Sequence, residues 1–176
     1  MHMADALIYP AVGGALWATT AGLLAYSSRK LALEADDKKI PLMGVTAAFV
    51  FAAQMINFTI PATGSSGHLG GGLILAVLLG PHAAFLAMAS VLTVQALFFA
   101  DGGLLALGGN IFNMGFFSGF VAYPLIFKPL AAAKPTRGRI VVGSLLAAVV
   151  GLQLGAFGVV LETLLSGITA LPFSTF

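Results

Sequence analysis

The sequence of 176 residues contains no cysteine and very little charge. Without cysteine the chain can form neither a disulfide nor a thiolate metal site. Charged residues make up only 8% of the chain, whereas average proteins contain about 25%. The chain therefore lacks the charged surface that a soluble globule needs to face water.

The chain contains long apolar runs instead of charged segments. Hydrophobic residues make up 59% of the chain, and the mean hydropathy is +1.03. A helix needs about 20 apolar residues to cross a bilayer. Five segments approach or exceed that length: Leu7–Tyr26, Ile40–Phe58, Ala83–Ala100, Leu104–Phe127 and Ile140–Leu165. This pattern predicts an all-α, polytopic transmembrane helical bundle that forms a single integral-membrane domain over residues 1–176.

The basic residues predict how the helices are oriented. All eight fall into two short regions: Arg29, Lys30, Lys38 and Lys39, then Lys128, Lys134, Arg137 and Arg139. The positive-inside rule places both regions in the cytoplasm, so an even number of crossings joins them. The shorter run Leu69–Leu79 is then needed as a crossing, extended backwards through Gly67 and His68. The result is about six helices, an N-terminus outside the cell membrane, and a polar cytoplasmic loop at Ser27–Lys39.

Two of the three histidines, His2 and His68, fall on the predicted outer side. His68 lies in the stretch Asn57–Gly72, NFTIPATGSSGHLGGG, where Pro61 and five glycines predict an irregular loop rather than a continuous helix. The third histidine, His82, follows the Gly80-Pro81 turn on the cytoplasmic side. We interpret it as a polar residue at the membrane interface.

Six amide or acid side chains lie inside the predicted helices: Gln54, Gln95, Asn110, Asn113, Gln153 and Glu162. Hydrogen bonds between helices, worth roughly 0.6 kcal/mol each, are the favoured interpretation over a substrate path. Asp101, in the sequence FFADGG, is predicted to cap the helix that begins near Leu104. An acidic side chain suits the positive end of a helix dipole.

The N-terminal pair Met1-His2 carries three nitrogen donors for a metal ion. The amine of Met1, the backbone nitrogen of His2 and its imidazole Nδ1 can close two adjoining chelate rings around one ion. His68, on the same predicted side, is the candidate for a fourth nitrogen. Planar ligation by four nitrogens favours Ni²⁺ or Cu²⁺ over Zn²⁺, Mg²⁺ or Ca²⁺. The alternative is that His2 only decorates the surface.

Several motifs together resemble one family: MHMADAL, SSGHLGGG, GPHAAF, VQALFFADGGLLALGGNIFNMGF and ETLLSG. The chain resembles, over nearly its whole length, the nickel/cobalt substrate-specific membrane subunit (S component) of energy-coupling-factor (ECF) ABC transporters. The resemblance implies that Met1, His2 and His68 hold the metal, the same ligands that the chelate chemistry suggests. Ni²⁺, or next Co²⁺, would be the transported substrate, and no catalytic cofactor is expected.

The resemblance also implies partners. These are a transmembrane coupling subunit, two cytoplasmic ATPase subunits and a small accessory membrane subunit, besides the metal ion and membrane lipid. Members of the family typically carry a seventh helix after the equivalent of Leu171–Phe176, and this sequence does not include one. No nucleic acid partner is expected.

Three classes of function remain open. The leading one is capture of a divalent metal for an ATP-driven importer in the cell membrane, with cobalt uptake for cobalamin synthesis as its close alternative. No glycine run ends in the GK[ST] of a phosphate loop, so the chain is expected to be non-catalytic, with ATP hydrolysed by its partners. An intramembrane enzyme would pair His68 or His82 with Asp101, but it lacks a plausible nucleophile. A metal-independent channel is the third class.

Overall fold

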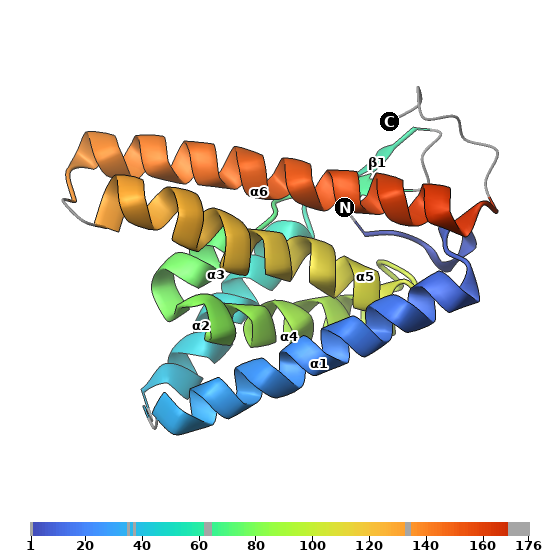
Figure 1. The fold of residues 1–176 in the computed structure, drawn as a ribbon, viewed down its shortest axis with the longest axis horizontal. Helices are drawn as coiled ribbons and strands as arrows, with labels where there is room; N and C mark the ends of the chain where they lie inside the picture. The colour runs from blue at the N-terminus through green and yellow to red at the C-terminus, as the bar shows by residue number, and fades with distance from the viewer. Residues whose placement is uncertain (1, 35, 37, 62–64, 133–134, 169–176) are drawn as a thin grey trace.

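The computed structural model describes residues 2–168 except for 35, 37, 62–64 and 133–134 (Figure 1). The predicted helical bundle is confirmed. Its elements are η1 (Asp5–Leu7), α1 (Pro10–Glu34), α2 (Lys39–Gln54), β1 (Phe58–Ile60), β2 (Ser65–Gly67), α3 (Gly72–Leu79), α4 (Pro81–Phe99), α5 (Leu107–Ile111), η2 (Phe112–Ala132) and α6 (Arg137–Ser166).

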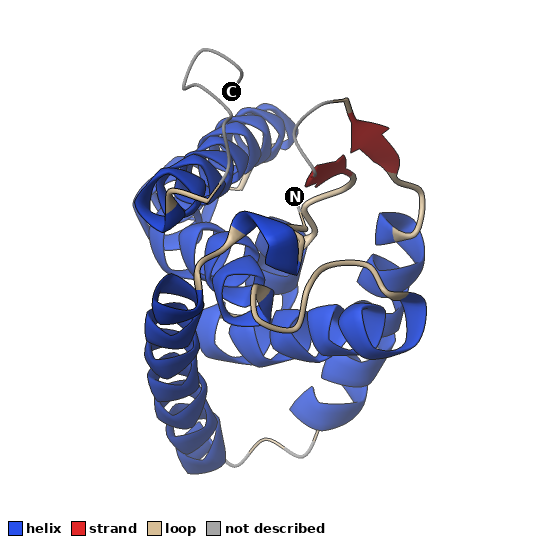
Figure 2. Ribbon diagram, turned by 90° about the vertical axis from the view of Figure 1, so that its right-hand side faces the viewer, coloured by secondary structure: helices blue, strands red, loops and turns tan. Residues whose placement is uncertain are grey.

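Helix α4 forms the centre of the bundle. It packs against α1, α2, α3, α5 and η2, and η2 in turn packs along α6 (Figures 1 and 2). Phe85, Met88 and Leu92 of α4 are fully buried, and Leu75 of α3 and Met114 of η2 belong to the same core. The alanines of α4 between these residues let the neighbouring helices approach closely.

Three helices are long and apolar enough to cross a membrane: Pro81–Phe99, Leu107–Ala131 and Arg137–Ser166. Helix α2 is apolar but shorter. Only 22% of the apolar window of α6 is buried within the protein. Most of this apolar surface therefore faces outward, as expected for a helix that contacts lipid rather than water.

The predicted crossing at Leu69–Leu79 is shorter in the structure. Helix α3 spans eight residues, Gly72–Leu79, and so is about 12 Å long. The predicted extension backwards through Gly67 and His68 is wrong, because Gly67 belongs to strand β2, which pairs antiparallel with β1. Gly71 has φ +74°, a left-handed conformation that stops a helix from extending through it.

The prediction of a polar loop at Ser27–Lys39 is also wrong over most of its length. Helix α1 continues to Glu34, well beyond its predicted end at Tyr26. The side chain of Ser27 is fully buried, and its hydroxyl lies 3.4 Å from Nδ1 of His82. The loop is predicted only because the segment is polar. In the structure Ser27 belongs to a helix and packs against the start of α4.

The predicted helix Leu104–Phe127 is observed as α5 followed without a break by η2, whose turns are of the wide π type. Pro124 and Pro129 lie inside η2. Because proline has no backbone N–H, it cannot take part in a regular α-helical ladder.

Hydrogen bonds between helices are confirmed for most of the polar residues expected to make them. Asn113 of η2 donates from Nδ2 to both carboxylate oxygens of Glu162 on α6, at 3.0 and 3.1 Å. Gln95 of α4 donates to Gln54 of α2 at 3.1 Å. Gln153 is exposed.

The backbones of α1 and α5 are in contact at Gly108. A Cβ atom added to Gly108 would lie 2.7 Å from the backbone nitrogen of Trp17. Thr20 donates a hydrogen bond to the Gly108 carbonyl at 2.8 Å, and the Trp17 indole donates to the Leu104 carbonyl at 2.9 Å. A small residue is therefore required at position 108.

We predict that Gly108→Ala lowers the stability of the detergent-solubilised protein by about 1–3 kcal/mol, because the new methyl group meets backbone atoms that cannot turn away. The measurement is the midpoint of thermal unfolding. Gly14→Ala is the matched control, since a Cβ there meets no atom within 4 Å. An equal midpoint for both variants would contradict the close contact.

Candidate metal centre

The segment before α1 enters the bundle instead of lying on its surface. His2 is 3% exposed and Met3 is fully buried. The Met3 backbone nitrogen donates to Oδ1 of Asn110 at 2.9 Å, and its carbonyl accepts from Nδ2 of Asn110 at 3.2 Å and from the Gly103 nitrogen at 3.0 Å. Surface decoration is therefore the wrong interpretation of His2.

Asp5, rather than Asp101, accepts hydrogen bonds at the start of the helical segment after Gly103. Its carboxylate accepts from the backbone nitrogens of Leu104 at 3.2 Å and Ala106 at 3.0 Å. The predicted capping role of Asp101 is wrong, because the N-terminal segment brings Asp5 to these N–H groups. Oδ1 of Asp101 instead lies 3.2 Å from Nδ1 of His2.

The structure brings His2 and His68 together. Their ring centroids are 4.5 Å apart, with an angle of 28° between the ring planes. The two rings are therefore stacked against each other.

The other predicted residues do not join this pair in the described structure. His82 lies elsewhere, with its ring edge-on to Tyr26 and Phe120. Met1, the predicted source of the amine donor, lies outside the described residues.

A chain of buried hydrogen bonds determines the proton position on His2. The Gly70 carbonyl can only accept, and it accepts from Nε2 of Gln54 at 2.9 Å. Oε1 of Gln54 therefore accepts from Nε2 of Gln95 at 3.1 Å, and Oε1 of Gln95 lies 3.0 Å from Nε2 of His2. Since Gln95 presents an acceptor, the proton is on Nε2 of His2, and Nδ1 carries the lone pair.

A second backbone carbonyl fixes the proton on His68. Nδ1 of His68 lies 2.8 Å from the carbonyl oxygen of Leu69, which can only accept. The proton is therefore on Nδ1, and Nε2 carries the lone pair. The nitrogen that carries the lone pair, and so can bind a metal ion, is Nδ1 in His2 and Nε2 in His68.

Both imidazoles are neutral near pH 7. Burial, with the charge of His68 as the next contribution, lowers the pKa of His2 to about 3. Burial also lowers the pKa of His68. Both residues lie outside the membrane-spanning helices. A neutral imidazole is the form that binds metals, so no proton on these rings has to leave when an ion binds near neutral pH.

Side chains alone do not complete a site. Within the described part of the chain, no three His, Asp or Glu side chains are arranged to hold an ion. A site that used the two imidazoles would need further donors, and the predicted chelate takes them from nitrogens of the N-terminal residues.

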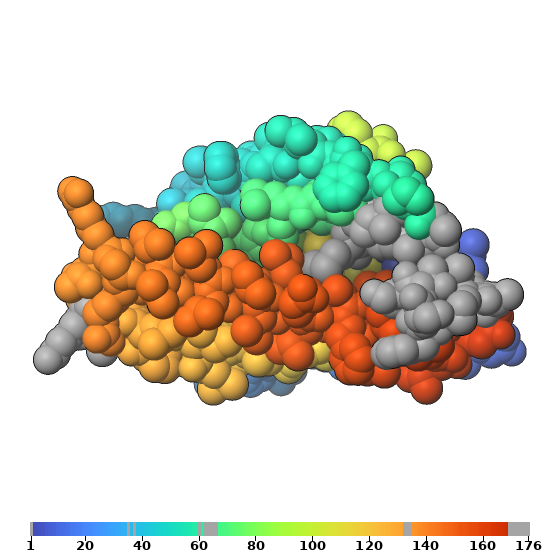
Figure 3. All heavy atoms as spheres, turned by 90° about the horizontal axis from the view of Figure 1, so that it is seen from above, coloured from blue at the N-terminus to red at the C-terminus, as the bar shows by residue number. Residues whose placement is uncertain are grey.

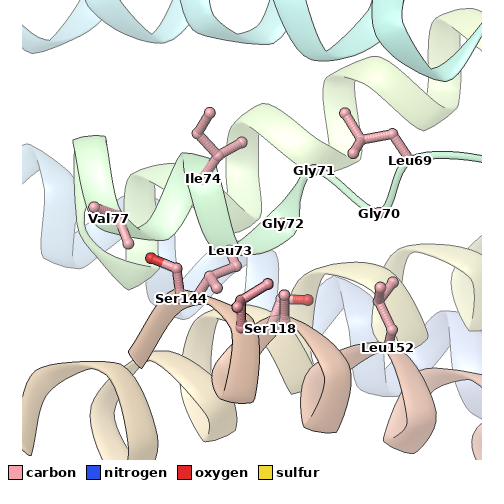
Figure 4. A pocket seen from close by; sticks show the side chains of 12 residues that line it. Leu69, Gly70, Gly71, Gly72, Leu73, Ile74, Val77, Ser118, Ser144 and Leu152 are labelled. Carbon is pink, nitrogen blue, oxygen red and sulfur yellow. The ribbon is translucent and has the colours of Figure 1, made fainter. Parts of the chain in front are cut away.

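An apolar groove of ≈ 390 Å³ lies between α3 and α6 and is distinct from this centre (Figure 4). In Figure 3 the green atoms of α3 lie next to the orange atoms of α6. Among the described residues that line it, the side-chain polar groups are the hydroxyls of Ser118 and Ser144. This lining has no ligand type that a transition metal prefers.

Sequence reasoning missed the link between Gln54, Gln95 and His2. The two glutamines were predicted to bond between helices, which is confirmed, but not to determine the chemistry of a histidine. The available signal was their position: polar side chains inside membrane helices are often functional. No pattern in the sequence indicates that either glutamine contacts His2.

Comparisons with known proteins identify relatives described as metal transport proteins. The family model described as "Cobalt uptake substrate-specific transmembrane region" matches residues 2–176. A putative fused nickel transport protein of Archaeoglobus fulgidus is 37% identical over 159 residues, 88% of this chain and 52% of that protein. A putative metal transport protein of Haloquadratum walsbyi is 43% identical over 125 residues, 71% of this chain and 57% of that protein.

A solved structure shares the fold. A crystal structure of a truncated transition metal transporter superposes with a TM-score of 0.85 at 32% identity, covering 99% of this chain and 79% of the other. The chain spans little more than half the length of the two sequence relatives described above.

We predict that Gln95→Leu weakens nickel binding by roughly 10–100-fold, the usual cost of losing a residue that orients a metal-binding histidine. Without the acceptor at Nε2, the His2 proton is free to move to Nδ1 and block the lone pair. ¹⁵N NMR of the His2 ring reads the tautomer directly and separates this effect from a general loss of stability. Gln153→Leu, at an exposed glutamine, is the matched control and should leave both measurements unchanged.

Proposed function

The chain belongs to the family of cobalt uptake substrate-specific transmembrane regions, and on this premise we propose that it captures a divalent transition-metal ion for import. Ni²⁺ is the first choice of substrate and Co²⁺ the second. The contact that carries the proposal is the one between His2 and His68, whose rings are 4.5 Å apart.

We infer that four nitrogens hold the ion. His2 supplies its Nδ1 and its backbone nitrogen, His68 supplies Nε2, and the amine of Met1 completes the set. The tautomers support the two imidazole assignments, because each hydrogen-bond chain ends at a carbonyl. The amine and backbone nitrogen follow from chelate geometry, which closes adjoining rings around one ion.

The metal preference follows from this donor set. Four nitrogens in a plane favour Ni²⁺, and Co²⁺ also binds to imidazole and amine nitrogens. Cu²⁺ would bind more tightly by the usual order of affinities, so metal availability contributes to selectivity in the cell. A subunit that delivers cobalt for cobalamin synthesis is the close alternative within the same function.

Import requires partners that this chain does not supply. We propose that it works as the S component of an ECF transporter, with a transmembrane coupling subunit, two cytoplasmic ATPase subunits and a small accessory membrane subunit. The absence of a phosphate-loop motif supports a non-enzymatic role for the chain itself. The proposed N-terminal site faces the outside of the cell membrane, because the positive-inside rule places the basic segments in the cytoplasm.

We predict that His2→Ala and His68→Ala each lower the affinity for Ni²⁺, since each removes a ligand. The loss should exceed the roughly 100-fold that removing a residue that only orients a ligand can cost. Isothermal titration calorimetry of the purified protein measures the affinity. His82→Ala is the matched control and should bind as the parent does, because His82 contacts Ser27, Tyr26 and Phe120 instead. Stoichiometric binding that survives His2→Ala would contradict the site.

A separate prediction concerns the amino terminus. Nickel binding should release at least one proton, because the His2 backbone nitrogen must lose its hydrogen to become a ligand. Calorimetry in buffers of different ionisation enthalpy counts this proton, and the affinity should rise with pH. Selective acetylation of the Met1 amine should abolish tight binding. Unchanged binding after acetylation would remove the amine from the ligand set while leaving the imidazoles in it.

A further inference from the structure

The connection between η2 and α6 carries positive charge that no acidic residue in the same segment offsets. Residues 128–139 contain four basic residues and no Asp or Glu. Residues 29–39 also contain four basic residues, but this segment has three acids, Glu34, Asp36 and Asp37, and its Lys39 forms an ion pair with Glu34. The segment at the start of α6 is therefore the more strongly charged of the two.

Both basic segments lie at one end of the bundle. Figure 1 shows the connection between α1 and α2 and the start of α6 at the left. Lys128 near the end of η2 and Arg137 and Arg139 in the first turn of α6 are all exposed. They adjoin the apolar surface of α6, of which only 22% is buried within the protein. Basic side chains at the end of a membrane helix lie at the level of the lipid headgroups.

Arg139 is held in position by the end of η2. Its Nε donates to the Leu130 carbonyl at 2.7 Å, and its Nη2 donates to the Pro129 carbonyl at 3.4 Å. These bonds use two of the five N–H groups of a guanidinium, and among the described residues the other three have no hydrogen-bond partner. The guanidinium is thus oriented in advance and keeps donors for an anion such as a phosphate.

A groove of ≈ 240 Å³ lies beside Arg139. Leu130 of η2 and Gly138, Arg139 and Val142 of α6 line it. A Cβ added to Gly138 would meet no atom within 4 Å, so the floor of the groove is open there. Beyond Val142 the exposed apolar face of α6 continues through Leu145, Leu146 and Val149. An apolar channel that begins at an arginine suits a ligand with a hydrocarbon chain and an anionic head.

We propose that this basic groove, formed by Lys128, Leu130, Arg137, Gly138, Arg139 and Val142, binds one anionic phospholipid. The phosphate lies at the three basic side chains, and an acyl chain follows the groove onto α6. A lipid supplies both the charge and the hydrocarbon, whereas an acidic protein surface or a free phosphate supplies only the charge. In the proposed orientation this end faces the cytoplasmic leaflet, which carries anionic lipids. The inference goes beyond the proposed function, because the metal ion takes no part in lipid binding.

The double variant Lys128→Gln/Arg137→Gln tests the charge and leaves the hydrogen bonds of Arg139 in place. Native mass spectrometry of the detergent-solubilised protein measures its affinity for phosphatidylglycerol and for phosphatidylcholine with the same acyl chains. The parent should prefer phosphatidylglycerol, and the variant should lose roughly 5-fold in affinity for each charge removed, about 25-fold in all. Arg29→Gln/Lys30→Gln is the matched control and should bind as the parent does, because it removes the same charge outside the groove.

Three results would overturn the role of the charge. These are equal affinity of the parent for both lipids, parent-like binding of phosphatidylglycerol by the Lys128→Gln/Arg137→Gln variant, and an equal loss in the control variant. Binding of the purified coupling subunit to the basic groove, with no phosphatidylglycerol bound to the parent, would instead assign the groove to a protein partner.

Gly138→Leu tests the acyl chain, because it keeps every charge and fills the groove. The affinity for phosphatidylglycerol should fall roughly 4-fold for each methylene group that the new side chain displaces. Gly22→Leu is the matched control, since Gly22 is also an exposed helix glycine whose Cβ would meet no atom within 4 Å. Thermal unfolding midpoints close to that of the parent show that both variants are folded. Parent-like affinity in Gly138→Leu would overturn the acyl chain in the groove.

Discussion

The hydrogen bond from Gln54 to the Gly70 carbonyl is the constraint on which the proposed metal centre depends. A backbone carbonyl has no proton to donate, so it determines the direction of each bond that follows, through Gln95 to His2. The same contact holds the glycine-rich loop, two residues after His68, against α2. One interaction therefore sets both the position of one proposed ligand and the protonation of the other.

Burial within the protein explains why the N-terminal segment is held so closely. A backbone group without a hydrogen-bond partner is costly where water is excluded. The nitrogen and carbonyl of Met3 both bond to the side chain of Asn110, and the carbonyl also accepts from Gly103. These hydrogen bonds of the Met3 backbone hold His2 next to Gln95 in the metal-free protein. Pre-organisation lowers the ordering cost of binding.

The helices could be predicted because long apolar runs have few alternatives in a membrane. The errors occur where short-range patterns compete with distant contacts. Ser27 was assigned to a loop because it is polar, but it packs against His82. Asp101 was assigned as a cap because of its place in the sequence, but Asp5 arrives from the other end of the chain to do this.

The pairing of His2 with His68 was predictable in outline because the charge pattern places both on one side of the membrane. The structure places the two rings next to each other, and their role as metal ligands, together with the amine of Met1, stays a prediction. The central claim is most directly tested by an anomalous difference map of nickel-soaked crystals of the protein at the nickel absorption edge. The account predicts one strong peak at about 2.0 Å from both Nδ1 of His2 and Nε2 of His68. A peak at His82, or none near His2, would contradict it.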